Sequence, residues 1–219
     1  MKYTFKTEWL AILVIILSWG AGGYFYAHFP ERVVTHWNYE GVANGYSSRA
    51  MGAFLLPAML SAMYLLFIFL PKLDPKKDRY ESFARPYNII RASIIVMMFV
   101  IFIISGLVNL GWPIQISTVT PIMVGLLFIV LGNLMGKIKQ NWFVGFRMPW
   151  TLSSENVWNK TQRLGGWCMV GFGIVLVLTP LLPKMIGLPL FIAGIFGVGI
   201  IPTVYSYFIY KKEQQATQK

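Results

Sequence analysis

The side chains best suited to bind a partner gather in one polar stretch, NWFVGFRMPWTLSSENVW (141–158), which lies between long apolar runs. Arg147 carries five donors in a fixed fork, which suits a carboxylate, a phosphate or backbone carbonyls. Gly145 allows the backbone to turn before it, and Pro149 pushes Met148 away from helical geometry after it. A Gly, an Arg and a Pro so close together predict a preformed pocket that holds a partner group through Arg147.

The three tryptophans of this stretch offer a second interpretation. Trp142, Trp150 and Trp158 follow one another at equal spacing, about two helical turns apart. Tryptophan prefers the membrane–water interface, so these rings could instead form an aromatic belt along the inner leaflet. The sequence leaves both interpretations open.

The end of the stretch carries a helix start signal. Thr151 and Ser153 are of residue types that cap helices. Glu155 would fall in the first turn, where the helix dipole favours an anion. We therefore predict a helix that begins near Ser154.

A second polar stretch, FPERVVTHWNYEGVANGYSSR (29–49), holds His36. The other histidine of the chain, His28, directly precedes it. Together with Glu31 and Glu40 they could be considered as metal ligands. A metal site needs three or four converging ligands, and this spacing matches no known pattern. We predict no metal, and expect His36 to form a hydrogen bond within its own loop.

Motifs of catalytic chemistry are missing from the sequence. There is no HExxH, no GxSxG, no P-loop and no acidic pair inside an apolar run. The single Cys168 lies in an apolar run, so no disulfide framework exists. We predict a protein that is not an enzyme, with no catalytic residue and no cofactor.

The elements that position these stretches are membrane-spanning helices. The chain is 56% hydrophobic and 12% charged, whereas a soluble domain has about 25% charged residues. A helix needs roughly 20 apolar residues to cross a bilayer. The candidate runs are 9–27, 50–70, two within 92–136 separated by a turn at 111–117, 164–183 and 185–210. The predicted fold is all-α, a polytopic membrane protein with six transmembrane helices.

The distribution of basic residues predicts the orientation. If the N-terminus is cytoplasmic, 16 of the 19 Lys and Arg residues lie inside and 3 lie outside, as the positive-inside rule requires. Both ends are then inside (N-in/C-in), with an external loop at 29–49 and cytoplasmic loops at 71–91 and 137–163. The net charge of +11 faces the anionic inner leaflet of a plasma membrane, so no direct nucleic-acid binding is predicted.

The six apolar runs contain no Asp, Glu, Lys or Arg. Ionisable groups within a membrane mark proton and ion pathways, so their absence disfavours a proton-coupled pump or a channel with a charged filter. Asn109 and Asn133 are polar residues within these runs, and we expect them to form hydrogen bonds between helices.

Two motifs resemble known families. The outer loop resembles the N-terminal motif of a large family of small bacterial membrane proteins at Pro30, His36, Trp37, Gly41, Gly45 and Arg49, although Val34 replaces a usual proline. The inner loop resembles the signature of the SdpI family, which provides immunity to a sporulation-delaying peptide toxin. The matching residues are Asn141, Gly145, Arg147, Pro149, Trp150, Thr151, Ser153 and Trp158, followed by Gly165 and Gly166.

The resemblance implies a two-span unit at 1–70 and a four-span SdpI-like unit at 71–219. It also implies protection against a secreted membrane-active peptide toxin, with a soluble transcriptional repressor as a second partner at the cytoplasmic face of the bilayer. The expected partner-binding residues are His36, Trp37, Gly41, Gly45, Asn141, Gly145, Arg147, Pro149, Trp150, Thr151 and Trp158.

Three other functions stay open at this point. A small-molecule or lipid transporter fits the apolar spans. An enzyme acting on lipid headgroups at the inner face could use Arg147 to hold phosphate, and the third alternative is a purely structural scaffold.

Overall fold

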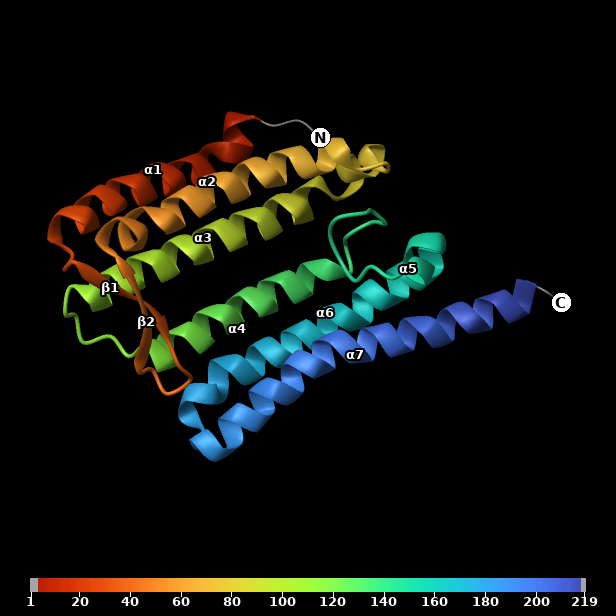
Figure 1. Ribbon diagram of the computed structural model, residues 1–219. Coiled ribbons are helices and arrows are strands. Elements are labelled where there is room, and N and C mark those ends of the chain that lie inside the picture. The colour runs from red at the N-terminus through yellow and green to blue at the C-terminus, as the bar shows by residue number, and fades with distance from the viewer. Residues whose placement is uncertain (1–3, 218–219) are drawn as a thin grey trace. The chain divides into compact units, whose positions relative to one another are not determined.

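Six long helices dominate the computed structural model, which describes residues 4–217 (Figure 1). All six are long and apolar enough to cross a membrane, and this confirms the predicted all-α, six-span architecture. They are α1 (Phe5–His28), α2 (Arg49–Leu73), α3 (Ala84–Asn109), α4 (Ile116–Met135), α6 (Glu155–Leu178) and α7 (Lys184–Thr217).

Within residues 4–217 there are also five shorter elements: β1 (Arg32–Trp37), β2 (Ala43–Ser48), η1 (Lys77–Phe83), α5 (Pro149–Ser153) and η2 (Thr179–Leu181). The inner loop predicted at 71–91 is largely helical, because α2, η1 and α3 occupy most of it. The predicted turn at 111–117 is confirmed, and Gly111 adopts a φ of 87° there, in the region that glycine tolerates best.

The chain forms two compact units. We call residues 2–68 and 91–123 the hairpin unit, because the two strands belong to it. Residues 69–90 and 124–219 form the connector unit, named after the segment between α4 and α6. The predicted boundary at residue 70 stays a prediction.

In the hairpin unit, α1, α2 and α3 pack side by side (Figure 1). One apolar cluster joins Val14, Leu60 and Ile95 from the three helices. At the other end of the helices, Phe25 packs edge-on against Phe102, with ring centroids 5.3 Å apart. Phe25 also fills the space beside Gly106, where a β-carbon would come within 2.1 Å of its ring.

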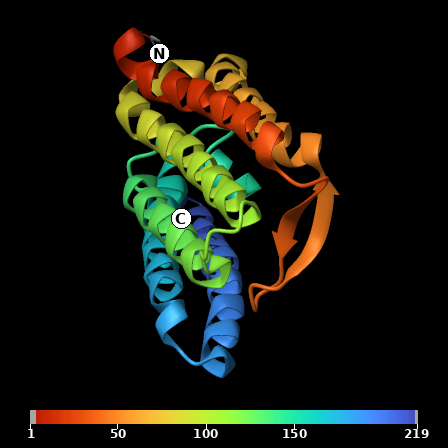
Figure 2. The same cartoon turned by 90° about the vertical axis from the view of Figure 1, so that its left-hand side faces the viewer.

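The strands β1 and β2 form an antiparallel hairpin after α1 (Figure 2). The register pairs Arg32 with Ser48 and Val34 with Tyr46, and it is irregular after Val34. Val33 is 1% exposed and packs where Gly52 of α2 leaves room, since a β-carbon there would lie 2.6 Å from the Val33 side chain. The two strands were not predicted from the sequence, which indicated a loop at 29–49.

A buried ion pair links α1 to α3 within the hairpin unit. Arg91 Nη2 donates to Glu8 Oε1 at 2.7 Å, and the two side chains are 2% and 8% exposed. Tyr64 of α2 donates to the other carboxylate oxygen at 3.0 Å. Glu8 and Arg91 lie just outside the apolar runs defined from the sequence, yet inside helices that can span the membrane.

In the connector unit, glycines bring α4 and α6 into close contact. A β-carbon on Gly132 would lie 2.5 Å from the carbonyl oxygen of Gly166, and one on Gly125 would lie 2.6 Å from that of Gly173. Close backbone approach at small residues is typical of helices packed in membranes.

The helices α6 and α7 also pack against each other. Gly194 of α7 leaves room for the ring of Phe172 in α6, whose atoms would lie 2.1 Å from an added β-carbon. In the connector unit, α6 therefore packs against α4 and against α7.

Candidate functional site

The connector, residues 136–154 between α4 and α6, is organised by the side chain of Asn141. Its Oδ1 accepts from the backbone N–H groups of Phe143 and Val144 at 2.8 and 2.7 Å. Its Nδ2 donates to the carbonyls of Lys139 and Val144. Asn141 is 0% exposed. It therefore fixes the turn from inside and is not available at the surface.

Gln162 of α6 holds the next part of the connector. Its Oε1 accepts from the backbone N–H of Phe146 and its Nε2 donates to the carbonyl of the same residue, both at 2.9 Å. Gly145 precedes this pair with a φ of 119°. A β-carbon there would lie 2.6 Å from Gln162 Oε1. Gly145 is thus required both by its dihedral angle and by the space it leaves.

The signature residues around α5 act as local capping groups. The hydroxyl of Thr151 accepts from the backbone N–H of Met148 at 2.9 Å, and Pro149 opens the helix at a position where the missing N–H costs little. The hydroxyl of Ser154 caps α6 by accepting from Val157 N–H at 3.2 Å. The predicted helix start is confirmed.

The three tryptophans have different environments. Trp158 is 0% exposed and its indole donates to the carbonyl of Ile138 at 2.8 Å. Trp150 is half-buried and donates to Ser206 Oγ of α7 at 2.7 Å. Trp142 is 48% exposed. A shared aromatic belt is therefore wrong for Trp158, which is a core residue.

Arg147 is exposed at the surface of the connector. Its Nη1 donates to the carbonyl of Trp142 at 2.6 Å, which orients the guanidinium. A guanidinium has five N–H donors, so the rest of the fork can reach a partner. Arg147 and Trp142 both combine a defined position with an exposed side chain.

Asp74, directly after α2, links the connector to the segment between α2 and α3. Its carboxylate is buried and accepts from the backbone N–H of Trp142 at 2.8 Å, from that of Lys76 at 2.7 Å and from the hydroxyl of Tyr80 at 2.9 Å. Sequence reasoning missed Asp74. The available signal was an Asp directly before Pro75, a pattern typical of turns.

Two cations converge on Gln140 beside this carboxylate. Lys76 Nζ and Arg79 Nη1 both donate to Gln140 Oε1. Glu155 pairs with Arg79 at 3.3 Å. Burial, and then the nearby Arg79, lower the pKa of Lys76 below its usual value, because both disfavour its charged form.

The residues predicted in the outer loop lie together in the hairpin. His36 Nδ1 lies 2.6 Å from Asn44 Oδ1, which confirms the expected bond within the loop. Gly41 has a φ of 81°. A β-carbon on Gly45 would lie 2.7 Å from that of His36. The glycines shape the hairpin, and His36 stays exposed.

Asn109 of α3 holds the hairpin in place. Its side-chain amide accepts from the N–H of Val34 at 2.8 Å and donates to the carbonyl of Val34 at 2.9 Å. The expected hydrogen bonds between helices are wrong, because Asn109 bonds to a strand and Asn133 donates to Ile129 of its own helix. Among residues 4–217, no group of three His, Cys, Asp or Glu could hold a metal ion.

Comparison with known proteins gives a match for each of the two sets of residues. The family model described as SdpI/YfhL protein family matches residues 137–206, and a domain of unknown function (DUF1648) matches residues 13–60. The protein named Immunity protein SdpI of Bacillus subtilis (strain 168) is 25% identical over 207 residues, which are 94% of this chain and 97% of that protein.

The chain is thus similar to the SdpI/YfhL protein family within residues 137–206 and to one immunity protein over most of its length. The SdpI/YfhL match contains the connector from residue 137 and α6, and the second match contains the hairpin. Six helices able to span a bilayer, together with this similarity, indicate a multi-pass protein of the cell membrane. No solved structure matches the chain.

Proposed function

We propose that this chain is a membrane immunity protein that protects the cell carrying it from a secreted membrane-active peptide toxin. The observation that carries the proposal is the extent of the similarity to the immunity protein of B. subtilis. It covers almost the whole of both chains, so it is not limited to one shared module. Protection by binding needs no turnover, and we assign no catalytic residue.

In the proposed orientation, both termini and the connector face the cytoplasm and the hairpin faces outward. The 16 to 3 distribution of Lys and Arg supports this orientation. A toxin that arrives from outside would then meet the hairpin first. The connector would be the inner functional site.

Within the connector, Arg147 and Trp142 are the proposed contact residues. The buried bonds of Asn141, Gln162 and Thr151 hold the backbone beneath them, and a preorganised surface loses less entropy when it binds. A soluble repressor that docks here stays a prediction. The basic side chains of the inner face would favour a partner with acidic patches.

The test is growth of a toxin-sensitive bacterium that expresses the chain, in the presence of synthetic sporulation-delaying peptide. Wild-type protein should restore growth, and Arg147→Ala should restore it less. The matched control is Lys139→Ala, which removes another exposed cation of the connector and should protect fully.

Membrane levels of each variant must be equal for this comparison. If wild-type protein gives no more growth than an empty vector, the proposed function is wrong. If Arg147→Ala protects as well as Lys139→Ala, immunity stands but the assignment of Arg147 is wrong. Flux of the peptide across proteoliposomes would instead favour the transporter alternative.

A further inference from the structure

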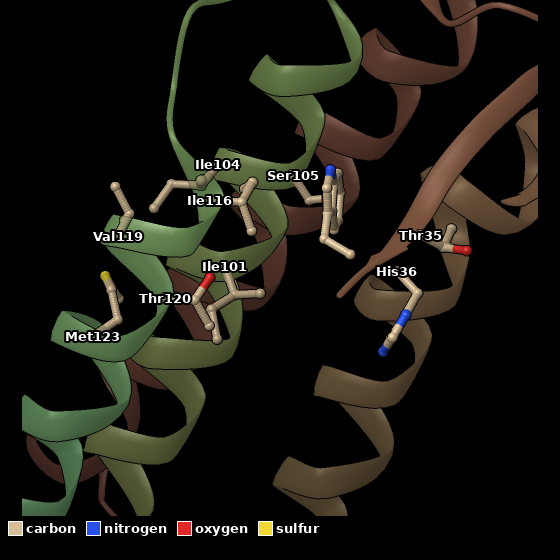
Figure 3. A pocket seen from close by; sticks show the side chains of 10 residues that line it. Thr35, His36, Ile101, Ile104, Ser105, Ile116, Val119, Thr120 and Met123 are labelled. Atoms are coloured by element: carbon tan, nitrogen blue, oxygen red, sulfur yellow. The ribbon is translucent and has the colours of Figure 1, made fainter. Parts of the chain in front are cut away.

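A cavity of about 310 Å³ lies within the hairpin unit, between β1 on one side and α3 and α4 on the other (Figure 3). Its walls are mainly aliphatic, with Ile101 and Ile104 from α3 and Val119 and Met123 from α4. His36 is exposed at its β1 wall. The cavity therefore combines apolar walls with a polar ring on its β1 side.

The lining also includes polar residues. Thr35, Ser105 and Thr120 carry hydroxyls, Trp37 carries an indole N–H, and His36 carries its ring. In the tautomer with the proton on Nδ1, the His36 ring donates to the side-chain Oδ1 of Asn44, 2.6 Å away. In that tautomer Nε2 is an acceptor, held in position by the hairpin. No Asp, Glu, Lys or Arg lines the space.

The size of the cavity limits its occupant. An apolar protein cavity of about 150 Å³ accepts a benzene molecule, so about 310 Å³ accepts roughly two ring-sized groups. Pockets for drug-sized ligands begin near this volume. The space fits a few side chains of a larger ligand, not a whole phospholipid.

We infer that this cavity is the receptor site for an uncharged apolar segment of the secreted peptide, with a peptide N–H donating to His36 Nε2. This inference rests on the proposed function and names the site through which the chain recognises the toxin. The segment is uncharged because a charged side chain would be buried here without a partner, which is strongly unfavourable.

A peptide fits this lining better than a lipid chain does. An acyl chain offers no donor or acceptor, so it would cover the polar atoms of His36, Ser105 and Thr120 without forming a hydrogen bond to them. Burying polar groups in this way is costly. A peptide brings backbone N–H and carbonyl groups together with apolar side chains. It can therefore form hydrogen bonds to the polar lining residues and pack against the apolar ones.

The experiment uses synthetic sporulation-delaying peptide that carries a diazirine and biotin, added to membranes that contain the full chain. Photolysis and mass spectrometry then map the adducts. Wild-type protein should give adducts on cavity residues of α3 and α4, and unlabelled peptide should compete. A parallel sample contains a diazirine-bearing phosphatidylglycerol in place of the labelled peptide.

The informative variant is Thr120→Phe, which fills the cavity from an exposed position of α4. Losing one buried apolar group of the ligand should reduce peptide adducts about tenfold, and protection should fall with them. Thr118→Phe is the matched control, because Thr118 lies on α4 outside the lining and should behave as wild type. Ser105→Leu fills the cavity from α3 if the first variant accumulates poorly.

The outcomes separate the site from the function. If the filled variants keep both adducts and protection, the cavity assignment is overturned while immunity stands. If the phospholipid labels the cavity and the peptide does not compete, the cavity is a lipid site and the assignment is overturned. If wild-type cells are not protected but peptide adducts form in the cavity, the binding site stands and the immunity proposal fails.

Discussion

The residues of the connector signature mostly bind their own backbone. Asn141, Thr151 and Trp158 are each 0% exposed, and every one forms a hydrogen bond to the main chain. A buried polar group without a partner costs about 1–3 kcal/mol, so these bonds make the loop conformation unique. Their role at this scale is to hold Arg147 and Trp142 in position.

Gly145→Ala tests how strongly the connector depends on one dihedral angle. The added methyl group would meet Gln162 Oε1 at 2.6 Å and the backbone is at a φ of 119°, so we expect a loss of about 1–3 kcal/mol in the free energy of unfolding. Thermal unfolding in detergent measures it. Gly136→Ala is the control, because its β-carbon would make only ordinary contacts. Equal melting temperatures would show that the connector relaxes freely.

The Glu8–Arg91 ion pair predicts a strong and non-additive effect. Glu8→Gln leaves Arg91 buried opposite a neutral group, and removing one partner of a buried pair costs about 3–5 kcal/mol. The double variant Glu8→Gln with Arg91→Met should be less destabilised than the sum of the two single variants. A double-mutant cycle of unfolding free energies measures this coupling, and additive values would argue against it. Glu40→Gln, on the exposed hairpin, should be neutral.

Lys76, beside the connector, predicts a pH dependence of the free energy of unfolding. Its pKa is lowered in the folded chain by burial and by Arg79, so the unfolded chain binds more protons in the alkaline range below the usual lysine pKa. Stability contributed by this group must therefore rise with pH across that range. The measurement is the free energy of unfolding from pH 8 upward, in the wild type and in Lys76→Met. The difference between the two slopes against pH is the contribution of Lys76. A slope that is the same in both proteins would contradict the prediction.

Single residues were predictable where their partners are close in sequence. Ser154 caps a helix three residues on, and His36 bonds to Asn44 eight residues on. Asp74 binds the N–H of Trp142 across 68 residues, and Glu8 binds Arg91 across 83. Such partners are brought together only by folding, so residue types and local spacing could not reveal them.

At the scale of elements, the glycine contacts between α4 and α6 set how closely these helices approach. Gly132→Val would place a β-carbon 2.5 Å from the carbonyl oxygen of Gly166. The helices must move apart, at a cost of about 1–3 kcal/mol typical of overpacking. Thermal unfolding should show a lower midpoint than for Gly171→Val, since Gly171 of α6 faces open space. Similar midpoints would mean that the two helices are not tightly packed.

The hairpin is the element that the sequence did not predict. A two-stranded ribbon is only marginally stable by itself, and its strands here are six residues each. Its stability comes from contacts remote in sequence: Asn109 binds both backbone groups of Val34, and Val33 packs beside Gly52. The long helices could be predicted without such contacts, because crossing a bilayer requires an apolar run of a minimum length that is visible in the sequence.

For the whole molecule, the orientation is the prediction with the widest consequences. In a Cys168→Ala background, a cysteine at Tyr39 of the hairpin should react with a membrane-impermeant maleimide in intact cells. A cysteine at Arg147 should react only after lysis, because the side of the protein that carries most of the basic residues should face the cytoplasm. Labelling of position 147 in intact cells would reverse the proposed assignment of the two faces.

The fully buried side chains of Asn141 and Trp158 also bear on what a shared connector motif implies. Residues that hold the fold together are constrained by packing and not by the molecules that the protein binds. Two proteins can therefore share this motif and yet recognise unrelated molecules. Differences in binding preference between them should be sought at solvent-facing positions and along the walls of the cavity beside β1, not in the buried residues of the motif.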